Sequence, residues 1–294
     1  MMKRPSRRIW ICVALLLAAL LPSCAANKKM TVGATAMLLE DVATATSKQS
    51  DLKVVEKGMP AYLMLMDGMV EAVPANERLL LAAAQSYASY ASAFIEDKDP
   101  EYALALFQRA RDYAMAALAE RGLQNPATIP FETFESQVAA LGPKDVPYLF
   151  WCAANWGSWI SLNLESMEAM AELPRVESMM RRVLVLDESF HYGGPHLFMG
   201  IWYAARPPMA GGDLERAQEH FNRALELGKH QFLMTAVYFA DYYARKTFDK
   251  QLFTETLQNV LETPVDTIPE LTLLNTVAHR KARQMLKEAD DYFE

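Results

Sequence analysis

Helical periodicity runs through the chain from Leu52 to its C-terminal end. Apolar side chains recur there at spacings of three and four residues, which is the pattern of amphipathic helices. No stretch of strand length alternates strictly between apolar and polar residues, and the sequence contains no Asn-Gly hairpin turn. The pattern therefore predicts an all-α protein.

Two helices with complementary large and small residues can be recognised around an acidic turn. The spacing is that of a tetratricopeptide unit, in which small residues let two antiparallel helices approach and large residues fill the gaps. Asp99 is the expected N-cap of the second helix, and Pro100 is its expected first residue. The packing positions of this first pair are Tyr87, Tyr90, Ala91 and Phe94, followed by Ala103, Phe107 and Ala110.

Three later pairs fit the same spacing with altered turns. Their packing positions are Ala153, Trp156, Gly157, Ile160, Val176, Met180 and Val183 in the second pair, Met199, Gly200, Tyr203, Ala217, Phe221 and Ala224 in the third, and Ala236, Phe239, Ala240, Tyr243, Phe253, Leu257 and Val260 in the fourth. Asp213 is expected to cap the second helix of the third pair. Additional helices are predicted over 60–73, 131–141 and 269–293, the last as a terminal cap. We expect a tetratricopeptide-like superhelix with inserted and C-terminal helices over residues 51–294.

The N-terminal segment has the features of an export signal. Residues 1–8 carry four basic side chains and no acid, and residues 9–21 are almost wholly apolar. Thirteen helical residues span about 20 Å, less than the roughly 30 Å of a bilayer core, so the pattern predicts a signal peptide over residues 1–23. The sequence Leu21-Pro22-Ser23-Cys24 resembles a bacterial lipobox and predicts acylation of Cys24.

The mature N-terminus is expected to act as an anchor. Residues 24–50 are expected to form a lipidated tether with a weak helix, which attaches the protein to a membrane on the periplasmic side. Ala25 after the cysteine, by analogy with lipoprotein sorting rules, favours the outer membrane. Pro22 departs from the usual lipobox. The alternative is ordinary cleavage after Ala25 or Ala26, which would release a soluble protein.

Charge and the scatter of reactive side chains exclude several functions. Loss of the four basic residues of the leader changes the formal net charge from −7 to about −11, which disfavours nucleic-acid binding. The five histidines do not form a metal-ligand motif, and Cys152 lies within an apolar helix that disfavours a thiolate. We therefore expect no catalytic site, no metal and no cofactor.

One face of the first helix of each pair is predicted to line a concave groove. It lies opposite the packing positions at 100° per residue. This face is rich in aromatic residues and includes a few polar groups, as ligand pockets commonly do. The alternative is that these aromatic side chains belong to the core. The residues predicted to bind a ligand or partner are Trp151, Asn155, Trp159, Phe198, Trp202, Tyr238, Asp241 and Arg245.

Four stretches of the chain resemble the T-component of tripartite ATP-independent periplasmic (TRAP) transporters. They are Leu79 to Tyr87, Asp145 to Trp156, Tyr192 to His196, and Gly211 to Ala217 with His220-Phe221. The resemblance covers roughly residues 35–293. It implies a periplasmic lipoprotein of divergent tetratricopeptide fold, association with the substrate-binding protein of the transporter, and homotrimers with a pore-like cavity in each subunit.

Two functions from different classes follow from these features. The first is a non-enzymatic accessory subunit that binds the substrate-binding protein and holds or passes an apolar ligand. The alternative is a tetratricopeptide scaffold lipoprotein that organises envelope proteins and holds no ligand. A hydrolase would need a clustered nucleophile or metal site, and the sequence offers neither.

Overall fold

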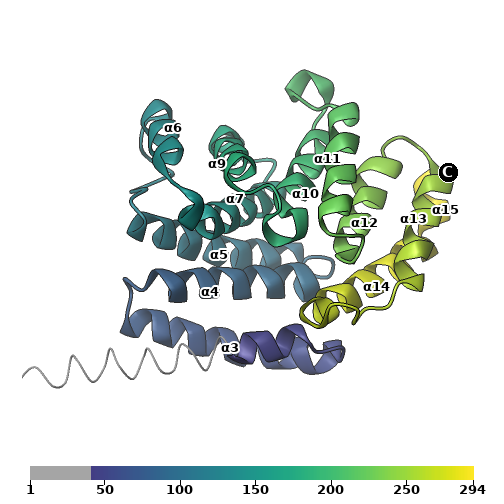
Figure 1. The fold of residues 1–294 in the computed structure, drawn as a ribbon, viewed down its shortest axis with the longest axis horizontal. Coiled ribbons are helices and arrows are strands. Elements are labelled where there is room, and N and C mark those ends of the chain that lie inside the picture. Colours follow the sequence, from purple (N-terminus) through teal and green to yellow (C-terminus); the bar gives the residue numbers. More distant parts are fainter. Residues whose placement is uncertain (1–40) are drawn as a thin grey trace, which may run out of the picture.

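The computed structural model describes residues 41–294, and these residues form helices without any strand (Figure 1). The all-α prediction is therefore confirmed for this part of the chain. The predicted signal peptide and Cys24 lie outside the described residues. The α-helices are α3 (Leu52–Ala72), α4 (Glu77–Tyr90), α5 (Pro100–Glu120), α6 (Phe131–Ala140), α7 (Val146–Ser161), α8 (Met167–Ala171), α9 (Leu173–Leu186), α10 (Phe190–Ala205), α11 (Leu214–Leu227), α12 (Leu233–Phe239), α13 (Lys250–Glu262), α14 (Thr272–Lys287) and α15 (Ala289–Phe293).

Consecutive helices pack in pairs, as the spacing of large and small residues predicts. α4 packs on α5, α7 on α9, α10 on α11 and α12 on α13. All seven predicted packing residues of the first pair are buried, and so are those of the third pair. In the second and fourth pairs only Gly157, Ala236 and Tyr243 are partly exposed. The burial positions expected from the sequence are thus largely confirmed.

The predicted helix starts are also confirmed by their capping contacts. The Tyr102 amide donates to Asp99 Oδ1 at 3.0 Å, and Pro100 is the first residue of α5. The Arg216 amide donates to Asp213 Oδ1 at 3.1 Å at the start of α11. Each carboxylate satisfies an amide that the helix itself leaves without an acceptor.

Two predicted helices have different bounds in the structure. The first begins at Leu52 and not at Pro60, because the Asp51 carboxylate caps it by accepting from the amides of Lys53 and Val54. Pro60 lies inside α3 on its exposed side. The C-terminal segment is not one helix over 269–293, since it breaks at Glu288 into α14 and α15 after an initial 3₁₀ turn.

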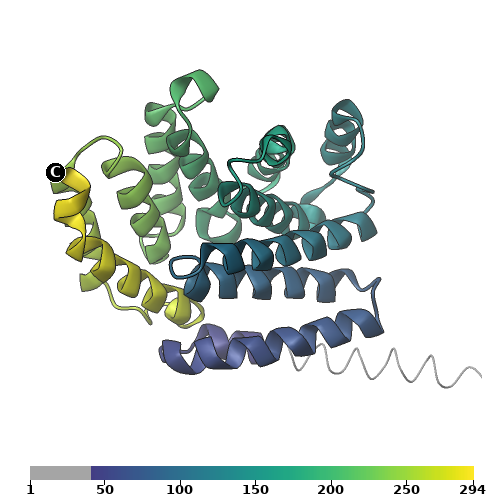
Figure 2. The same ribbon diagram turned by 180° about the vertical axis from the view of Figure 1, so that it is seen from behind.

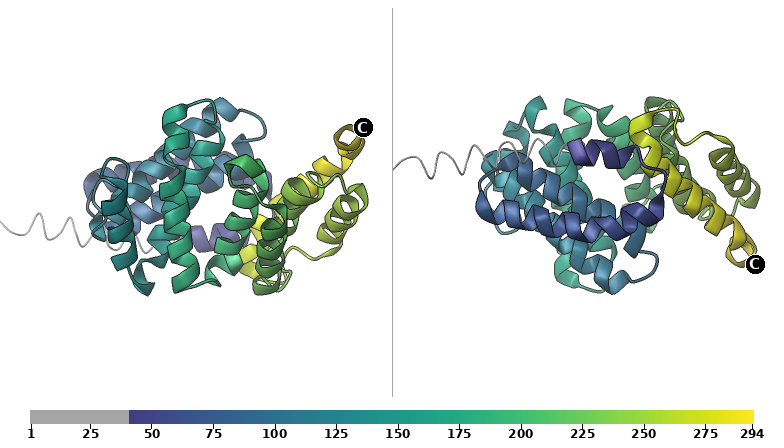
Figure 3. Two further views of the ribbon diagram at one scale, coloured as in Figure 1. Left: turned by 90° about the horizontal axis from the view of Figure 1, so that it is seen from above. Right: turned by 90° about the horizontal axis from the view of Figure 1, so that it is seen from below.

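α3, α4 and α5 are stacked on one side, and α12 to α15 lie on the other side (Figure 2). Seen from above and from below, the helices surround an opening between the ribbons (Figure 3). The helix of residues 41–47, drawn in purple, is visible through the opening from above and at its edge from below (Figure 3). The fold therefore turns the first helices of the pairs toward a shared interior.

Two first helices end in a turn of π-helix. η1 (Ala91–Ile95) follows α4, and η4 (Ala240–Ala244) follows α12. The Glu96 amide donates to the Ala91 carbonyl and the Arg245 amide to the Ala240 carbonyl, in each case five residues back. Such turns are rare and occur frequently at functional sites, because they shift the side chains that follow.

A third irregularity interrupts α10 near its start. His191, Tyr192 and Gly193 have φ values of 49°, 60° and 82°, so three consecutive residues adopt left-handed conformations. A Cβ atom at Gly193 would lie 3.0 Å from Leu227 Cβ and 3.1 Å from the Ala224 backbone. Left-handed residues other than glycine are strained and persist only where surrounding packing enforces them. The close contact between α10 and α11 supplies that packing.

Candidate ligand cavity

The first helices of the pairs surround a cavity of about 1960 Å³. Side chains from α3, α4, α7, α10 and α12 line it, together with residues from η1, η4, α14 and the helix of residues 41–47. The second helices contribute little, which agrees with the predicted separation of packing and groove faces. Pockets for drug-sized ligands usually measure about 300–1,000 Å³. This cavity therefore has room for a long or bulky molecule.

Seven of the eight residues predicted for the groove lie in this cavity wall. Trp159 is the exception, because its ring stacks on the guanidinium of Arg111 in α5 with a distance of 4.1 Å from Cζ to the ring centroid. Arg111 also forms an ion pair with Glu172 at 3.2 Å. Trp159 thus belongs to the seam between α5 and α7. The residues that do line the cavity are Trp151, Asn155, Phe198, Trp202, Tyr238, Asp241 and Arg245.

One side of the cavity is an aromatic cluster around His191. The His191 ring centroid lies 5.1 Å from that of Trp151, 5.8 Å from that of Phe150 and 5.6 Å from that of Phe232. Burial lowers the pKa of His191 to about 4, so its imidazole is neutral at neutral pH. His191 was not among the residues predicted for the groove. Its only local signal is the Gly193-Gly194-Pro195 run that follows it.

A second aromatic wall is formed by the C-terminal half of α10. Phe198 and Trp202 are stacked with centroids 5.8 Å apart, and the Arg206 guanidinium lies 4.2 Å above the Trp202 ring. Trp202 is only 7% exposed, and its Nε1 has no hydrogen-bond acceptor among the described residues. Trp202 is therefore both a wall residue and a well-packed part of the fold.

The side of the cavity near the two π-helical turns is polar. Asp241 accepts a hydrogen bond from Arg245 Nη1 at 2.7 Å, and burial raises the pKa of Asp241 and of Glu96. Burial also raises the pKa of Tyr242 to about 12, so its hydroxyl stays neutral and can donate a hydrogen bond. With Tyr238, these groups give this side of the cavity several hydrogen-bonding side chains.

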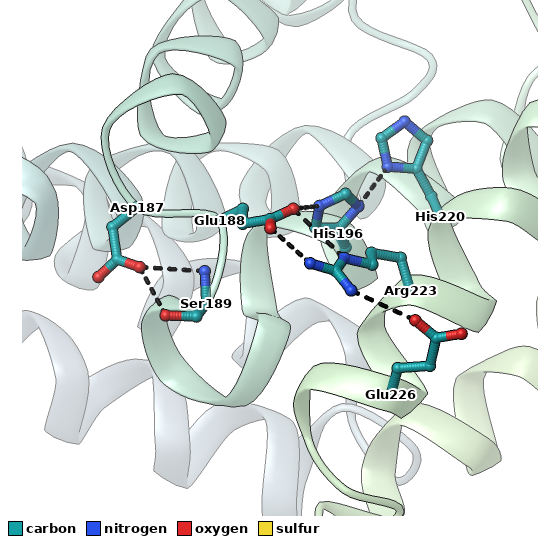
Figure 4. A network of polar contacts seen from close by, with 7 residues as sticks. All are labelled: Asp187, Glu188, Ser189, His196, His220, Arg223 and Glu226. Atoms are coloured by element: carbon teal, nitrogen blue, oxygen red, sulfur yellow. Dashed lines mark hydrogen bonds and ion pairs between the residues drawn. The ribbon is translucent and has the colours of Figure 1, made fainter.

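A polar network outside this cavity joins α10 to α11 (Figure 4). His196 Nδ1 lies 2.9 Å from His220 Nδ1, and His196 Nε2 lies 2.9 Å from Glu188 Oε2. Arg223 Nη2 donates to Glu188 Oε1 at 2.5 Å, and the hydrogen bonds from Arg223 and then His196 lower the pKa of Glu188 to about 2. Burial lowers the pKa of His220 to about 4. The network fixes the helix pair.

The described residues offer little for metal binding or thiol chemistry. Within residues 41–294, no three histidine, cysteine or carboxylate side chains are grouped so that they could hold a metal ion. Cys152 is completely buried, and burial raises its pKa to about 12, so it stays a packing thiol as expected. No helix in this part of the chain has the length and apolar character needed to cross a membrane.

Comparisons with known proteins identify what the chain resembles. The family model described as "TRAP transporter T-component" matches residues 48–293. A protein of Treponema pallidum (strain Nichols), described as uncharacterized, is 23% identical over 267 residues, which cover 84% of this chain and 82% of that protein. The family match spans the whole set of helix pairs that encloses the cavity.

Proposed function

The chain belongs to the TRAP transporter T-component family, and on this premise we propose that it binds the substrate-binding protein of such a transporter and holds an apolar ligand in its cavity. Membership makes it an accessory component of a TRAP transporter. The observation that carries the proposal is the large cavity lined by apolar residues of the first helices. A scaffold without a ligand would not need such a cavity, which favours the accessory subunit over the scaffold.

The proposal includes a location and an assembly. Acylation of Cys24 would hold the protein on the periplasmic face of a membrane, with the outer membrane favoured. The helix pairs would be divergent tetratricopeptide units, and the subunit would form homotrimers. The export signal and the lipobox-like sequence support this location, and the burial pattern of the pairs supports the repeat interpretation.

An exposed apolar patch at α8, formed by Leu164, Met167 and Met170, is the surface where we expect the partner to bind. Leu164 is 61% exposed, Met167 is 87% exposed and Met170 is 37% exposed. Leu164 and Met170 also line the cavity. A substrate-binding protein that exchanges an apolar ligand must sit where the ligand can pass without crossing water, and this patch offers such a contact.

Partner binding can be tested with purified proteins. The mature chain without its lipid is mixed with the substrate-binding protein of a TRAP transporter from the same organism, and the complex is measured by sedimentation velocity. We expect a complex, and Met167→Glu should weaken it. Met209→Glu is the matched control, since Met209 is 96% exposed and does not line the cavity. Absence of a complex at high protein concentration would refute this part of the proposal.

Ligand binding requires a separate measurement. Protein purified under native conditions should release an apolar molecule on denaturation, detectable by mass spectrometry of an organic extract. Native mass spectrometry should show the corresponding mass on the folded chain. A chain that carries no ligand and does not bind a neutral apolar dye, but still binds the partner, would instead support the scaffold.

A further inference from the structure

Two cations of the cavity wall gather at the C-terminal end of α10 without an ion pair. Arg206 and Lys246 both line the cavity, and neither forms an ion pair with a carboxylate of residues 41–294. Arg78 is a third lining cation without an ion pair, but it belongs to the start of α4. Arg245, which lies next to Lys246 in the sequence, is paired with Asp241 at 2.7 Å. The contrast matters because the protein has an excess of acidic residues and could have supplied a carboxylate.

Both cations are held in place by the C-terminal end of α10. Lys246 Nζ donates to the carbonyls of Ala204 and Ala205 at 2.7 and 3.2 Å. Arg206 Nε donates to the Trp202 carbonyl at 3.1 Å. These carbonyls carry the negative end of the helix dipole, which orients the cations but only partly offsets their charge. The side chains are therefore positioned, and hydrogen-bonding capacity remains on both.

The surroundings make an unpaired charge costly for Arg206, which is half-buried, whereas Lys246 is exposed. The Arg206 guanidinium lies on the ring of Trp202, and burial lowers the pKa of Arg206 below its usual value, although the charge of Glu177 partly opposes this shift. Phe198 and Ile201 continue the apolar wall along α10. A desolvated charge is stabilised strongly by an opposite charge brought into contact with it. An anion at this end of the wall would supply that contact.

The acids of the cavity wall do not meet this need. Asp241 is already paired with Arg245. Glu96 follows η1 and belongs with the tyrosines of the polar region, because burial and then nearby acids that include Glu96 raise the pKa of Tyr238 and Tyr242. The C-terminal end of α10 is therefore a cationic spot beside an apolar wall.

We propose that Arg206 and Lys246 form an anion subsite that takes the carboxylate of an amphipathic ligand, while the apolar tail lies along Phe198 and Ile201. A guanidinium offers a planar pair of donors that matches a carboxylate, and the ammonium adds a second positive charge. This assignment rests on the proposed function, because it specifies the class of ligand that the cavity holds.

The test compares three ligands that share one tail. Dodecanoate, 1-dodecanol and dodecylamine are titrated against the purified mature chain, and binding is followed by displacement of a neutral apolar dye. We expect dodecanoate to bind about tenfold or more tightly than the alcohol, as one charge-assisted contact implies. In Arg206→Gln/Lys246→Gln this preference should fall to within about threefold, with the affinity for the alcohol unchanged.

The controls separate the subsite from the cavity and from folding. Arg78→Gln removes a cation that lines the same cavity from the start of α4, and it should leave the preference for the carboxylate intact. Binding of the alcohol by the double variant shows that its cavity is still folded. Equal affinity for the acid and the alcohol in the wild-type chain, or tighter binding of the amine, would overturn the subsite. Failure of all three ligands to bind would instead refute the proposed apolar ligand.

Discussion

Gly200 provides a sharp test of how α10 and α11 pack. A Cβ atom added there would lie 2.9 Å from Phe221 Cγ, 3.0 Å from Cδ2 and 3.1 Å from Cδ1, directly against the ring. Phe221 is fully buried, and Phe239 packs against it with ring centroids 5.6 Å apart. The ring therefore cannot move aside freely, and Gly200→Ala should overpack the helix pair.

The size of the effect follows from two opposing terms. Alanine is favoured over glycine inside a helix by about 1 kcal/mol. Overpacking a close core contact costs about 1–3 kcal/mol. Gly68→Ala isolates the helix-propensity term, because Gly68 is exposed inside α3 and its Cβ would meet nothing within 4 Å. Gly68→Ala should raise the free energy of unfolding. The free energy of unfolding of Gly200→Ala should be about 1–3 kcal/mol lower than that of Gly68→Ala.

Thermal unfolding followed by circular dichroism measures the difference. At about 2–4 °C per kcal/mol for a domain of this size, the two midpoints should differ by roughly 2–12 °C. Equal shifts for Gly200→Ala and Gly68→Ala would refute the packing assigned to Gly200.

Three further predictions concern pH, anchoring and the aromatic wall. Stability should fall as the pH drops from 6.5 toward 4, because burial lowers the pKa of His191 and His220 to about 4 while the unfolded chain binds these protons near pH 6.5. Urea unfolding at a series of pH values measures this loss, and a flat profile over that interval would contradict it. Cys24→Ala should move the protein from the membrane pellet to the soluble fraction, whereas unchanged pelleting would exclude the lipid anchor. Trp202→Ala should cost about 3–5 kcal/mol of stability because Trp202 is well buried, whereas Trp151→Ala should cost less and mainly weaken ligand binding. Melting and dye binding are measured on both variants. A larger loss of stability in Trp151→Ala than in Trp202→Ala would contradict the prediction.

The helix pairs could be predicted from the sequence because their packing is periodic. Small residues such as Ala91 and Ala103 recur at fixed distances from large ones, and this local pattern determines which face is buried. The opposite face then follows by geometry, which is why spacing alone predicts that Trp151, Phe198 and Tyr238 face the groove. Capping at Asp99 and Asp213 is equally local.

The irregular parts of the wall could not be predicted in this way. A helical wheel advances by a constant angle, whereas η1 and η4 each widen one turn and shift the side chains that follow. The left-handed segment at His191 depends on its packing between helices and not on its own composition. Trp159 leaves the groove because Arg111 from another helix stacks on it, and such a long-range pairing leaves no trace in local spacing.

The helix of residues 41–47 has a thermodynamic consequence for the cavity. Val42, Thr44 and Ser47 line the cavity, yet most of this helix is exposed, and the adjacent Lys48 forms an ion pair with Glu270 at 3.3 Å. A ligand that touches this helix stabilises the docked position of the helix. Docking of the helix in turn strengthens ligand binding by the same free energy. Protection of residues 41–49 from proteolysis should therefore report the occupancy of the cavity.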